Sequence, residues 1–250
     1  MRIGFLSYLN SYPFTAAFRS KALLSDDELT FDVPTTLNQK FSQEELDISQ
    51  ISSIEHLKRD YPILPGYGIA AHKKILSVNL YTKQEPTHLS APIAITSESA
   101  TAAALLKVLC HHFWNISPSF IPLKKGEEKS HNAFLLIGDK ALKNQIIPGY
   151  LTVDLAEAWA HYTRLPFVFC VFAIQPKQLE KADKFQEILQ AALNWSKQHP
   201  QQMLSLAHTH VSLSSSLIEK YLSGCTYHLG EKELEGLALF NALRKEPAYV

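Results

Sequence analysis

One local pattern recurs along this 250-residue chain and restricts it to few architectures. A short run of β-branched or aromatic residues ends in a turn of small polar side chains, and a helical period follows the turn. Residues 2–7, 46–50 and 93–95 are three such runs. Strands that alternate with helices in this way are typical of α/β proteins, in which helices cover a largely parallel sheet. The sequence therefore predicts an α/β fold.

The same signals predict the remaining elements. Residues 63–75 contain Pro65, Gly66 and Gly68, which are typical of a loop. Every segment after residue 174 is predicted to be helical. Further strands are expected at residues 31–33, 76–82, 120–122, 133–137 and 165–174, and helices at 14–19, 99–111, 140–144, 155–161, 183–199 and 231–244.

The helical segment after the long apolar strand at 165–174 indicates that the chain returns to the lobe in which it began. We therefore expect a discontinuous first lobe, built from residues 1–87 and 173–250. Residues 88–172 are expected to form a second lobe that is inserted into the first. The two crossing segments, near residues 82–90 and 169–175, would then act as hinges.

Charge and composition exclude several classes of function. Lys plus Arg total 24 and Asp plus Glu total 24, so the net charge is zero, without the basic surface that nucleic-acid binding needs. No window approaches the ~20 apolar residues that cross a bilayer, and the N-terminus lacks the pattern of a signal peptide. Cys110, Cys170 and Cys225 are far apart and favour reduced thiols. We expect a cytoplasmic protein that binds neither nucleic acid nor membrane.

Small polar side chains open several of the predicted helices, and this is the main functional signal. A helix N-terminus presents free N–H groups and a positive dipole end, and in an open α/β sheet such ends gather where ligands bind. For any single turn an ordinary helix cap is the simpler interpretation. Together the turns predict a site for a small anion. They hold Asn10, Ser11, Ser52, Ser53, Ser97, Ser99, Thr101 and the acidic Asp139.

Some of these positions have the spacing of defined caps. Ser52 with Glu55, and Ser216 with Glu219, match the capping box, in which two side chains satisfy each other's backbone amides. Asp139 and Asp154 stand where N-cap residues would precede the helices that follow them.

Other kinds of site are not supported. Zinc needs three or four convergent ligands, and no such spacing of His and Cys occurs. No dinucleotide fingerprint, Walker motif or nucleophile elbow is present. We expect neither a metal nor a cofactor.

Six motifs then follow one another in a familiar order. They are SYLNSYPF at residues 7–14, VPTTLN at 33–38, DISQISSIE at 47–55, TSESAT at 96–101, LLIGDKAL at 135–142, and the segment 154–169 that ends in LPFVF. In this order they resemble the chorismate dehydratase family of the futalosine route to menaquinone. The resemblance is weak beyond residue 173.

The resemblance implies both a fold and a reaction. The fold would be like that of type II periplasmic binding proteins, with two lobes, mixed sheets, helices on both faces and substrate in an interlobe cleft. The reaction would remove water from chorismate, a small dianion, to give 3-[(1-carboxyvinyl)oxy]benzoate, which makes the enzyme a carbon–oxygen lyase. A monomer or weak homodimer is expected.

The family's cleft residues map onto individual positions of this chain. Asn10 and Ser77 would be catalytic, and Asp139 matches the family's Gly-Asp pair. The sequence departs from the family at residues 71–74, Ala-His-Lys-Lys, where a Gly-Pro-containing loop is usual, and at Arg164, where Gly is usual. The turns at Ser52-Ser53 and at residues 97–101 would hold the substrate carboxylates. The substrate-binding residues would be Ser11, Ser52, Ser53, Ser97, Ser99, Thr101 and Asp139.

No protein base stands out among the motif residues, so one hypothesis is that the enolpyruvyl carboxylate of the substrate itself takes the ring proton. Asn10 and Ser77 would orient the reacting groups or stabilise developing charge. Three alternatives remain open. They are a non-catalytic solute-binding protein of the same fold, the sister enzyme that forms 1,4-dihydroxy-6-naphthoate, and a family member whose substrate differs because of Lys73 and Lys74.

Overall fold

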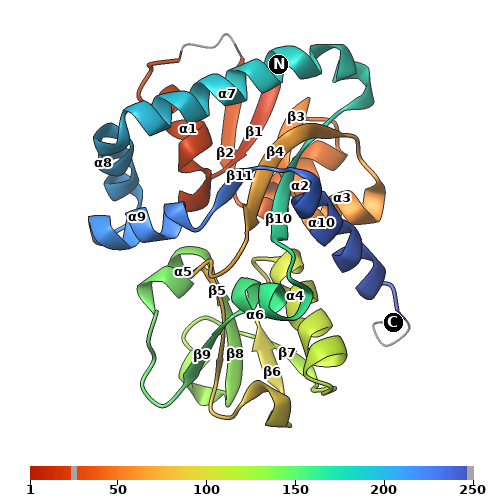
Figure 1. Cartoon of the computed structure of the whole chain (residues 1–250). Helices are drawn as coiled ribbons and strands as arrows, with labels where there is room; N and C mark the ends of the chain where they lie inside the picture. Colours follow the sequence, from red (N-terminus) through yellow and green to blue (C-terminus); the bar gives the residue numbers. More distant parts are fainter. Residues whose placement is uncertain (24–26, 247–250) are drawn as a thin grey trace. The chain divides into compact units, whose positions relative to one another are not determined.

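A computed structural model describes residues 1–23 and 27–246 of the chain (Figure 1). Contacts between Cα atoms divide it into two compact units. The first combines Met1–Ile69 with Cys170–Leu229, and the second combines Ala70–Phe169 with the residues from Gly230 onward. Each unit is therefore built from two separate segments of the chain and has a sheet of its own.

The first unit is organised on a mixed six-stranded sheet. Its strands are β1 (Arg2–Leu6), β2 (Glu28–Asp32), β3 (Ile48–Ser52), β4 (Ile63–Ala71), β10 (Phe167–Ile174) and β11 (Thr226–His228). Their order is β11-β4-β10-β3-β1-β2. β1 runs parallel to both β2 and β3, whereas β10 runs antiparallel to β3.

Helices cover both faces of this sheet. Successive side chains of a strand point to opposite faces, so neighbouring residues of β1 contact helices on different faces. The ring of Phe5 in β1 lies 5.8 Å from that of Phe18 and 5.9 Å from that of Phe172. Phe18 belongs to α1 (Tyr12–Arg19), which packs against α7 (Ala182–Gln198). The neighbouring Gly4 faces α2 (Pro34–Ser42), where a Cβ would lie 3.0 Å from Leu37. The other helices of the unit are α3 (Ser53–Arg59), α8 (Pro200–His210) and α9 (Ser215–Ser223).

The second unit has five strands, β5 (Val78–Thr82), β6 (Ile93–Ile95), β7 (Phe120–Pro122), β8 (Ala133–Ile137) and β9 (Leu151–Asp154). They form a mixed sheet in the order β7-β6-β8-β5-β9. β6 runs parallel to β7 and β8, and β5 runs antiparallel to β8 and β9. Its helices are α4 (Ala100–Val108), α5 (Gly138–Lys143), α6 (Leu155–Thr163) and α10 (Glu231–Leu243).

Trp159 of α6 is at the centre of one core of this unit and is fully buried. Its ring meets Phe167 edge to face at 5.5 Å and Phe240 of α10 at 6.1 Å. Its indole N–H donates to the carbonyl of Pro166 at 3.2 Å. Gly236 lets α10 approach this same carbonyl, since a Cβ there would collide with it. α10 is thus packed into the second unit by backbone proximity as well as by aromatic contacts.

The segment 63–71, predicted to be a loop, is the nine-residue strand β4. Pro and Gly ordinarily interrupt strands, but Gly in a strand can mark a close approach of another backbone. A Cβ on Gly68 would lie 2.6 Å from the carbonyl oxygen of Cys170 on β10 and would also collide with Leu229. Gly68 is therefore part of the sheet packing. The three-residue strand β11 was likewise missed, because it is short and its neighbours are helical.

The predicted lobe boundaries, 87/88 and 172/173, differ from the ends of the two units. β5 was placed with the first lobe, yet it pairs with β8 from Val78↔Ile137 to Thr82↔Ala133 and also with β9. A strand flanked on both sides by partners from one sheet belongs to that sheet. α10 was also assigned to the first lobe, but it packs against α4 and Trp159 in the second unit.

The cap of α9 differs from the prediction as well. Ser214, and not Ser216, is the N-cap, and its hydroxyl oxygen accepts a hydrogen bond from the amide of Leu217 at 3.3 Å. The run of serines at 214–216 offers several equivalent starts, and the sequence alone did not distinguish between them.

The three cysteines are free thiols. Cys110 and Cys170 are buried and Cys225 is partly exposed as a residue. Burial raises the pKa of each thiol to about 12, so all three are protonated at neutral pH. Unreactive protonated thiols are typical of structural cysteines. Within the described residues, no helix has both the length and the apolar character to cross a membrane.

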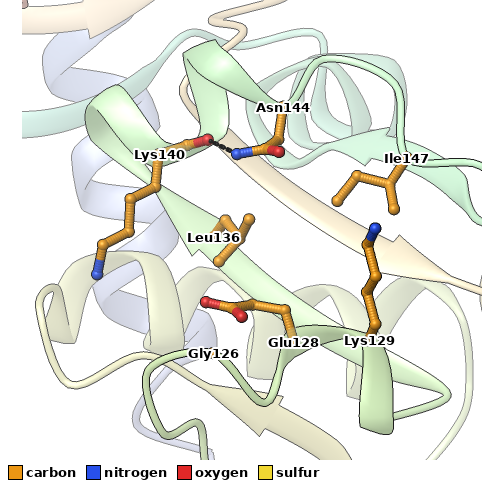
Figure 2. Close-up of a pocket in the computed structure, with 7 residues that line it drawn as sticks. All are labelled: Gly126, Glu128, Lys129, Leu136, Lys140, Asn144 and Ile147. Atoms are coloured by element: carbon orange, nitrogen blue, oxygen red, sulfur yellow. Dashed lines mark hydrogen bonds between the residues drawn. The ribbon is translucent and has the colours of Figure 1, made fainter.

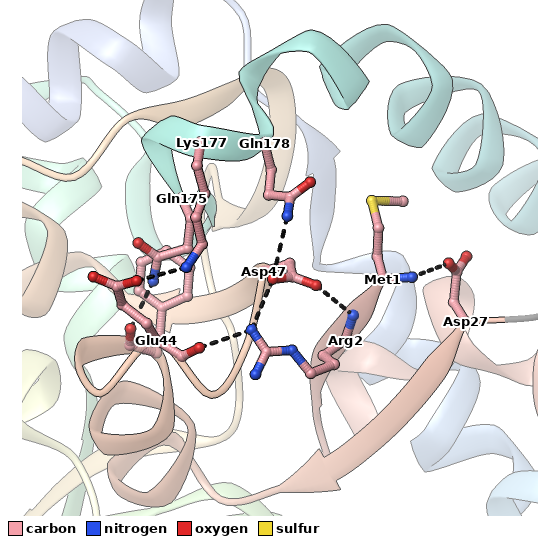
Figure 3. A network of polar contacts seen from close by, with 9 residues as sticks. Met1, Arg2, Asp27, Glu44, Asp47, Gln175, Lys177 and Gln178 are labelled. Atoms are coloured by element: carbon pink, nitrogen blue, oxygen red, sulfur yellow. Dashed lines mark hydrogen bonds and ion pairs between the residues drawn. The ribbon is translucent and has the colours of Figure 1, made fainter.

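A buried carboxylate ties the start of β1 to the residues after β10 (Figure 3). Asp47 accepts hydrogen bonds from the backbone amide of Arg2 at 2.9 Å, from Nη2 of Arg2 at 2.8 Å and from Gln178 at 3.4 Å. Burial favours the neutral acid, but the hydrogen bonds and charge of Arg2 outweigh it, so the pKa of Asp47 is held below its ordinary 3.8. The ionised group therefore stabilises the fold above that pH, and the stabilisation is lost as the pH falls through the lower folded pKa.

Asp47→Asn is expected to reduce the free energy of unfolding by about 1–3 kcal/mol at neutral pH, because an amide NH2 cannot accept the hydrogen bonds of Arg2. Urea unfolding measures the loss, which should shrink in strong acid, where the parent carboxylate is protonated as well. Glu44→Gln is the control, since the pair of Glu44 and Lys177, 2.6 Å apart, is exposed and screened by water, so its loss should change stability little. Equal losses in the two variants would contradict the role given to Asp47.

Candidate functional site

The predicted site residues of the first unit follow two neighbouring parallel strands. Asn10 and Ser11 lie in a short 3-10 turn after β1. Ser52 ends β3, and Ser53 begins α3. Because β1 and β3 pair in parallel, their carboxyl ends meet at one edge of the sheet. The structure therefore brings these four residues together, and we call them the first cluster.

Gln50 joins the two halves of the first cluster. It is fully buried in β3, and its Oε1 accepts hydrogen bonds from Ser11 Oγ at 2.6 Å and from the Leu6 amide at 2.7 Å. The helix-opening pattern of the sequence does not single it out. The available signal was a large polar side chain in the middle of an otherwise well-buried strand, which must find hydrogen-bond partners inside the protein.

Two buried polar atoms of this region have no hydrogen-bond partner among the described residues. They are Oδ1 of Asn10 and Nε2 of Gln50. A buried polar group left unpaired costs about 1–3 kcal/mol, so native proteins rarely retain one without a reason. An acceptor and a donor left open beside two helix starts fit a site that completes its hydrogen bonds with a polar ligand.

Ser52 is an N-cap, but only half of the predicted capping box forms. Its Oγ accepts from the amide of Glu55 at 3.3 Å and from Nδ2 of Asn38 at 3.1 Å. Its own amide donates to Oδ1 of Asn38 at 3.1 Å, whereas the Glu55 carboxylate pairs with Arg59 at 2.7 Å. Asn38 thus takes the place predicted for Glu55. With both lone pairs of Ser52 engaged, its hydroxyl hydrogen can still be donated to an anion.

The predicted site residues of the second unit also gather at one sheet edge, and we call them the second cluster. The turn at residues 96–99 follows β6, and Asp139 follows β8, its parallel neighbour. Ser77 precedes β5, which runs antiparallel to β8, so it lies at the same edge. The Ser77 carbonyl accepts a hydrogen bond from the Gly138 amide at 2.7 Å. Across the edge, Lys140 Nζ pairs with Glu98 at 2.5 Å.

Members of the second cluster differ in exposure and in local role. Ser99 caps α4 by accepting from the amide of Ala102 at 3.1 Å, while Ser97 is exposed and Thr101 is buried. Asp139 was predicted as an N-cap, but α5 begins at Gly138 with Ile137 at the cap position. Asp139 therefore lies in the first turn, where a carboxylate still interacts favourably with the positive end of the helix dipole.

Sequence comparison places the chain among known proteins. A protein family described as menaquinone biosynthesis matches residues 1–246. The chorismate dehydratase of Thermus thermophilus is 31% identical over 233 residues, which cover 83% of this chain and 83% of that protein. The chain belongs to the menaquinone biosynthesis family. A second relative, the chorismate dehydratase of Campylobacter jejuni, is 31% identical over 179 residues, or 70% of this chain and 64% of that protein.

Comparison with solved structures confirms the fold that the family resemblance implied. The periplasmic aliphatic sulphonate binding protein of Escherichia coli superposes with a TM-score of 0.72 over 100% of this chain and 88% of that one. Sequence identity is 12%, so the likeness concerns the fold alone. The menaquinone biosynthesis family member described here is thus an α/β protein with the periplasmic-binding-protein fold.

The loop before Ser77 is held by the buried carboxylate of Asp154, for which the sequence predicts only a helix cap. Oδ1 of Asp154 caps α6 through the amides of Ala156 and Glu157, at 3.0 and 3.1 Å. Oδ2 accepts from the amides of Ile75 and Leu76, at 2.8 and 2.6 Å. Burial raises the pKa of Asp154 to about 6, against the opposing effect of its backbone donors.

The two departures from the usual family sequence have local explanations. His72 Nε2 lies 2.6 Å from a carboxylate oxygen of the buried Glu233 on α10, and Lys74 Nζ lies 3.5 Å from Glu157 on α6. These basic side chains therefore engage carboxylates of the same unit. Arg164 ends α6 in the left-handed conformation, with φ +62°. Gly is favoured at such a position, which accounts for the residue usual in the family.

A separate cavity of about 330 Å³ lies beside α5 in the second unit (Figure 2). Leu136 and Ile147 form its apolar part, and Glu128, Lys129 and Lys140 bring charge. None of the predicted site residues is among its lining residues, so it does not coincide with the second cluster. Over the described ranges 1–23 and 27–246, no three His, Cys, Asp or Glu side chains are grouped so as to hold a metal ion.

Proposed function

We propose that this protein dehydrates chorismate to 3-[(1-carboxyvinyl)oxy]benzoate, as a carbon–oxygen lyase of menaquinone biosynthesis. The observation that carries the proposal is the 31% identity to a named chorismate dehydratase over 83% of both chains. The two clusters support it, since both offer hydroxyl donors and helix starts of the kind that bind carboxylates without a strong positive field. Chorismate carries two carboxylates.

The chemistry needs little from the protein beyond placement. The C–H bond at the ether-bearing ring carbon breaks, its electron pair forms the new ring double bond, and the neighbouring C–O bond breaks. The hydroxyl leaves with a proton as water, and the aromatic product provides the thermodynamic drive. In this proposal the substrate's enolpyruvyl carboxylate takes the ring proton. Holding that carboxylate against the C–H bond can lower the barrier by as much as about 7–11 kcal/mol.

The two clusters would share the remaining tasks. In the first, Asn10 and Ser11 would contact the reacting end, and Ser52 and Ser53 would donate to a carboxylate. In the second, Ser77 would assist the departing hydroxyl, and Ser97, Ser99 and Thr101 would hold the other carboxylate. Asp139 would border the site. The open hydrogen-bonding atoms of Asn10 and Gln50 support the first assignment.

Incubation of the purified protein with chorismate is expected to yield a new aromatic compound that is one water lighter than the substrate. Ultraviolet absorbance follows the aromatisation, and mass spectrometry identifies the product. Heat-denatured protein is the control, because chorismate also decomposes slowly without an enzyme. Binding of chorismate without product would favour the solute-binding alternative, and neither binding nor turnover would refute the proposal. The cytoplasmic location and the monomer or weak homodimer stay predictions.

A further inference from the structure

Ser77 follows a residue in an unusual backbone conformation. Leu76 has φ +64°, in the left-handed region that large L-residues rarely adopt. Such a conformation persists only where surrounding contacts fix it, and strained positions of this kind concentrate at functional sites. The contacts that fix Leu76 therefore determine where Ser77 is placed.

Three polar side chains hold this backbone. Asp154 Oδ2 accepts the amide hydrogens of Ile75 and Leu76, at 2.8 and 2.6 Å. The Leu76 carbonyl accepts from Asn79 Nδ2 at 2.9 Å and from Gln145 Nε2 at 2.8 Å. Both the amide and the carbonyl of the strained residue are thus fixed by side chains from outside the turn itself.

Ser77 is fixed on its other side too. Its carbonyl accepts from the Gly138 amide at 2.7 Å. The residue is 3% exposed, and its hydroxyl makes no hydrogen bond to any residue of the described chain. The carbonyl of Ser77 is therefore engaged while its hydroxyl is left available, which is the arrangement expected of a preorganised donor.

Asp154 does more than a helix cap requires. Capping α6 uses Oδ1 alone, and a serine hydroxyl could serve the same purpose. The second oxygen is directed to a loop 78 and 79 residues away in sequence. A carboxylate, with two acceptor oxygens, is the side chain that can serve both segments at once.

We propose that Asp154 is a positioning residue that places the Ser77 hydroxyl for reaction by holding the amides of Ile75 and Leu76, with Gln145 as a weaker second support. The inference rests on the proposed function, in which Ser77 contacts the substrate. Asp154 acts through Ser77 and does not touch the substrate.

The decisive variant is Asp154→Ser, which keeps an N-cap oxygen for α6 and removes the hydrogen bonds to the loop. Its kcat for chorismate is expected to fall about tenfold or more with little change in KM, because a misplaced catalytic group impairs chemistry more than binding. In a Ser77→Ala background the same substitution should cause no further loss, since residues that act through one group are not additive. A loss of equal size in both backgrounds would overturn the proposal.

Gln145→Met provides a second variant that leaves Asp154 intact. It removes the donor to the Leu76 carbonyl at a half-buried position and keeps the length of the side chain. We expect a smaller fall in kcat, again absent when Ser77 is Ala. Ser214→Ala is the matched control, since it removes the cap of α9 in the first unit and should leave kcat unchanged.

Amide hydrogen exchange tests the positioning without relying on activity. In Asp154→Ser the amides of Ile75 and Leu76 should exchange about tenfold faster or more, while those of α6 keep their protection because the serine still caps it. Unchanged exchange would overturn the proposal whatever happens to chorismate, and so would faster exchange with an unchanged kcat. If the parent does not turn over chorismate, the proposed function is wrong, and faster exchange alone would still support the positioning of Ser77 by Asp154.

Discussion

Asn10→Ala and Ser77→Ala are each expected to lower kcat/KM for chorismate by about 10²–10³-fold, the usual cost of removing one preorganised polar group from a catalytic site. The two residues lie in different clusters, but both present polar atoms that are not committed to the protein. Oδ1 of Asn10 has no partner in the described part of the chain, and the backbone of Ser77 is held while its hydroxyl is available. Steady-state kinetics on purified variants measure the effect.

Two substitutions of the same type outside the clusters serve as controls. Asn194→Ala in α7 and Ser223→Ala in α9 remove exposed side chains whose hydrogen bonds are to neighbouring residues of their own helices. Both should retain the parent kcat/KM, and circular dichroism should show that all four variants are folded. Turnover of chorismate at the parent rate by both Asn10→Ala and Ser77→Ala would remove the basis of the site assignment.

Trp159→Ala is expected to have the largest effect on stability, a loss of about 3–5 kcal/mol in the free energy of unfolding. The indole is fully buried. It contacts Phe167 and Phe240 edge to face and donates a hydrogen bond to the carbonyl of Pro166. Its removal leaves a large cavity between three segments of the second unit and an unpaired carbonyl. Urea unfolding followed by circular dichroism measures the loss.

The matched control is Trp195→Ala in α7, where the ring is only partly buried and stacks on His199 at 4.8 Å. A partly exposed indole has fewer core contacts to lose, so this variant should lose roughly 1–2 kcal/mol. Similar losses in the two variants would show that Trp159 does not have the central packing role that its burial indicates.

The sequence predicted regular elements well where local and tertiary preferences agree. Residues 2–7, 93–95 and 133–137 are apolar runs bounded by turns, and each forms a strand within one residue of the predicted bounds. The loop prediction for the segment that forms β4 was wrong, because its Pro and Gly are accommodated by tertiary packing, above all by the close approach of β10 to Gly68. The predicted assignment of β5 and α10 to the first lobe also differs from the structure. Which unit an element joins depends on long-range pairing, which a local sequence pattern does not indicate.

For the candidate site, the sequence located the turns but not the residues that organise them. Helix-opening Ser, Asn and Asp are visible as a pattern, and the structure places them at two sheet edges. The linking roles of Gln50 and Asp154 depend on partners 39 to 79 residues away. Such contacts arise only from the folded topology. A polar residue in an otherwise well-buried strand was the one local hint, and it applied to Gln50.

The division of the second unit between two chain segments has a consequence for synthesis on the ribosome. Residues 70–169 emerge well before α10, yet Phe240 and Gly236 complete the packing around Trp159 and Pro166. Until residues 230–246 have been translated, the nascent second unit exposes an unfinished aromatic surface. Residues 170–229 of the first unit are translated between the two segments of the second unit. The second unit, whose translation starts later, must therefore also be the last to complete its fold.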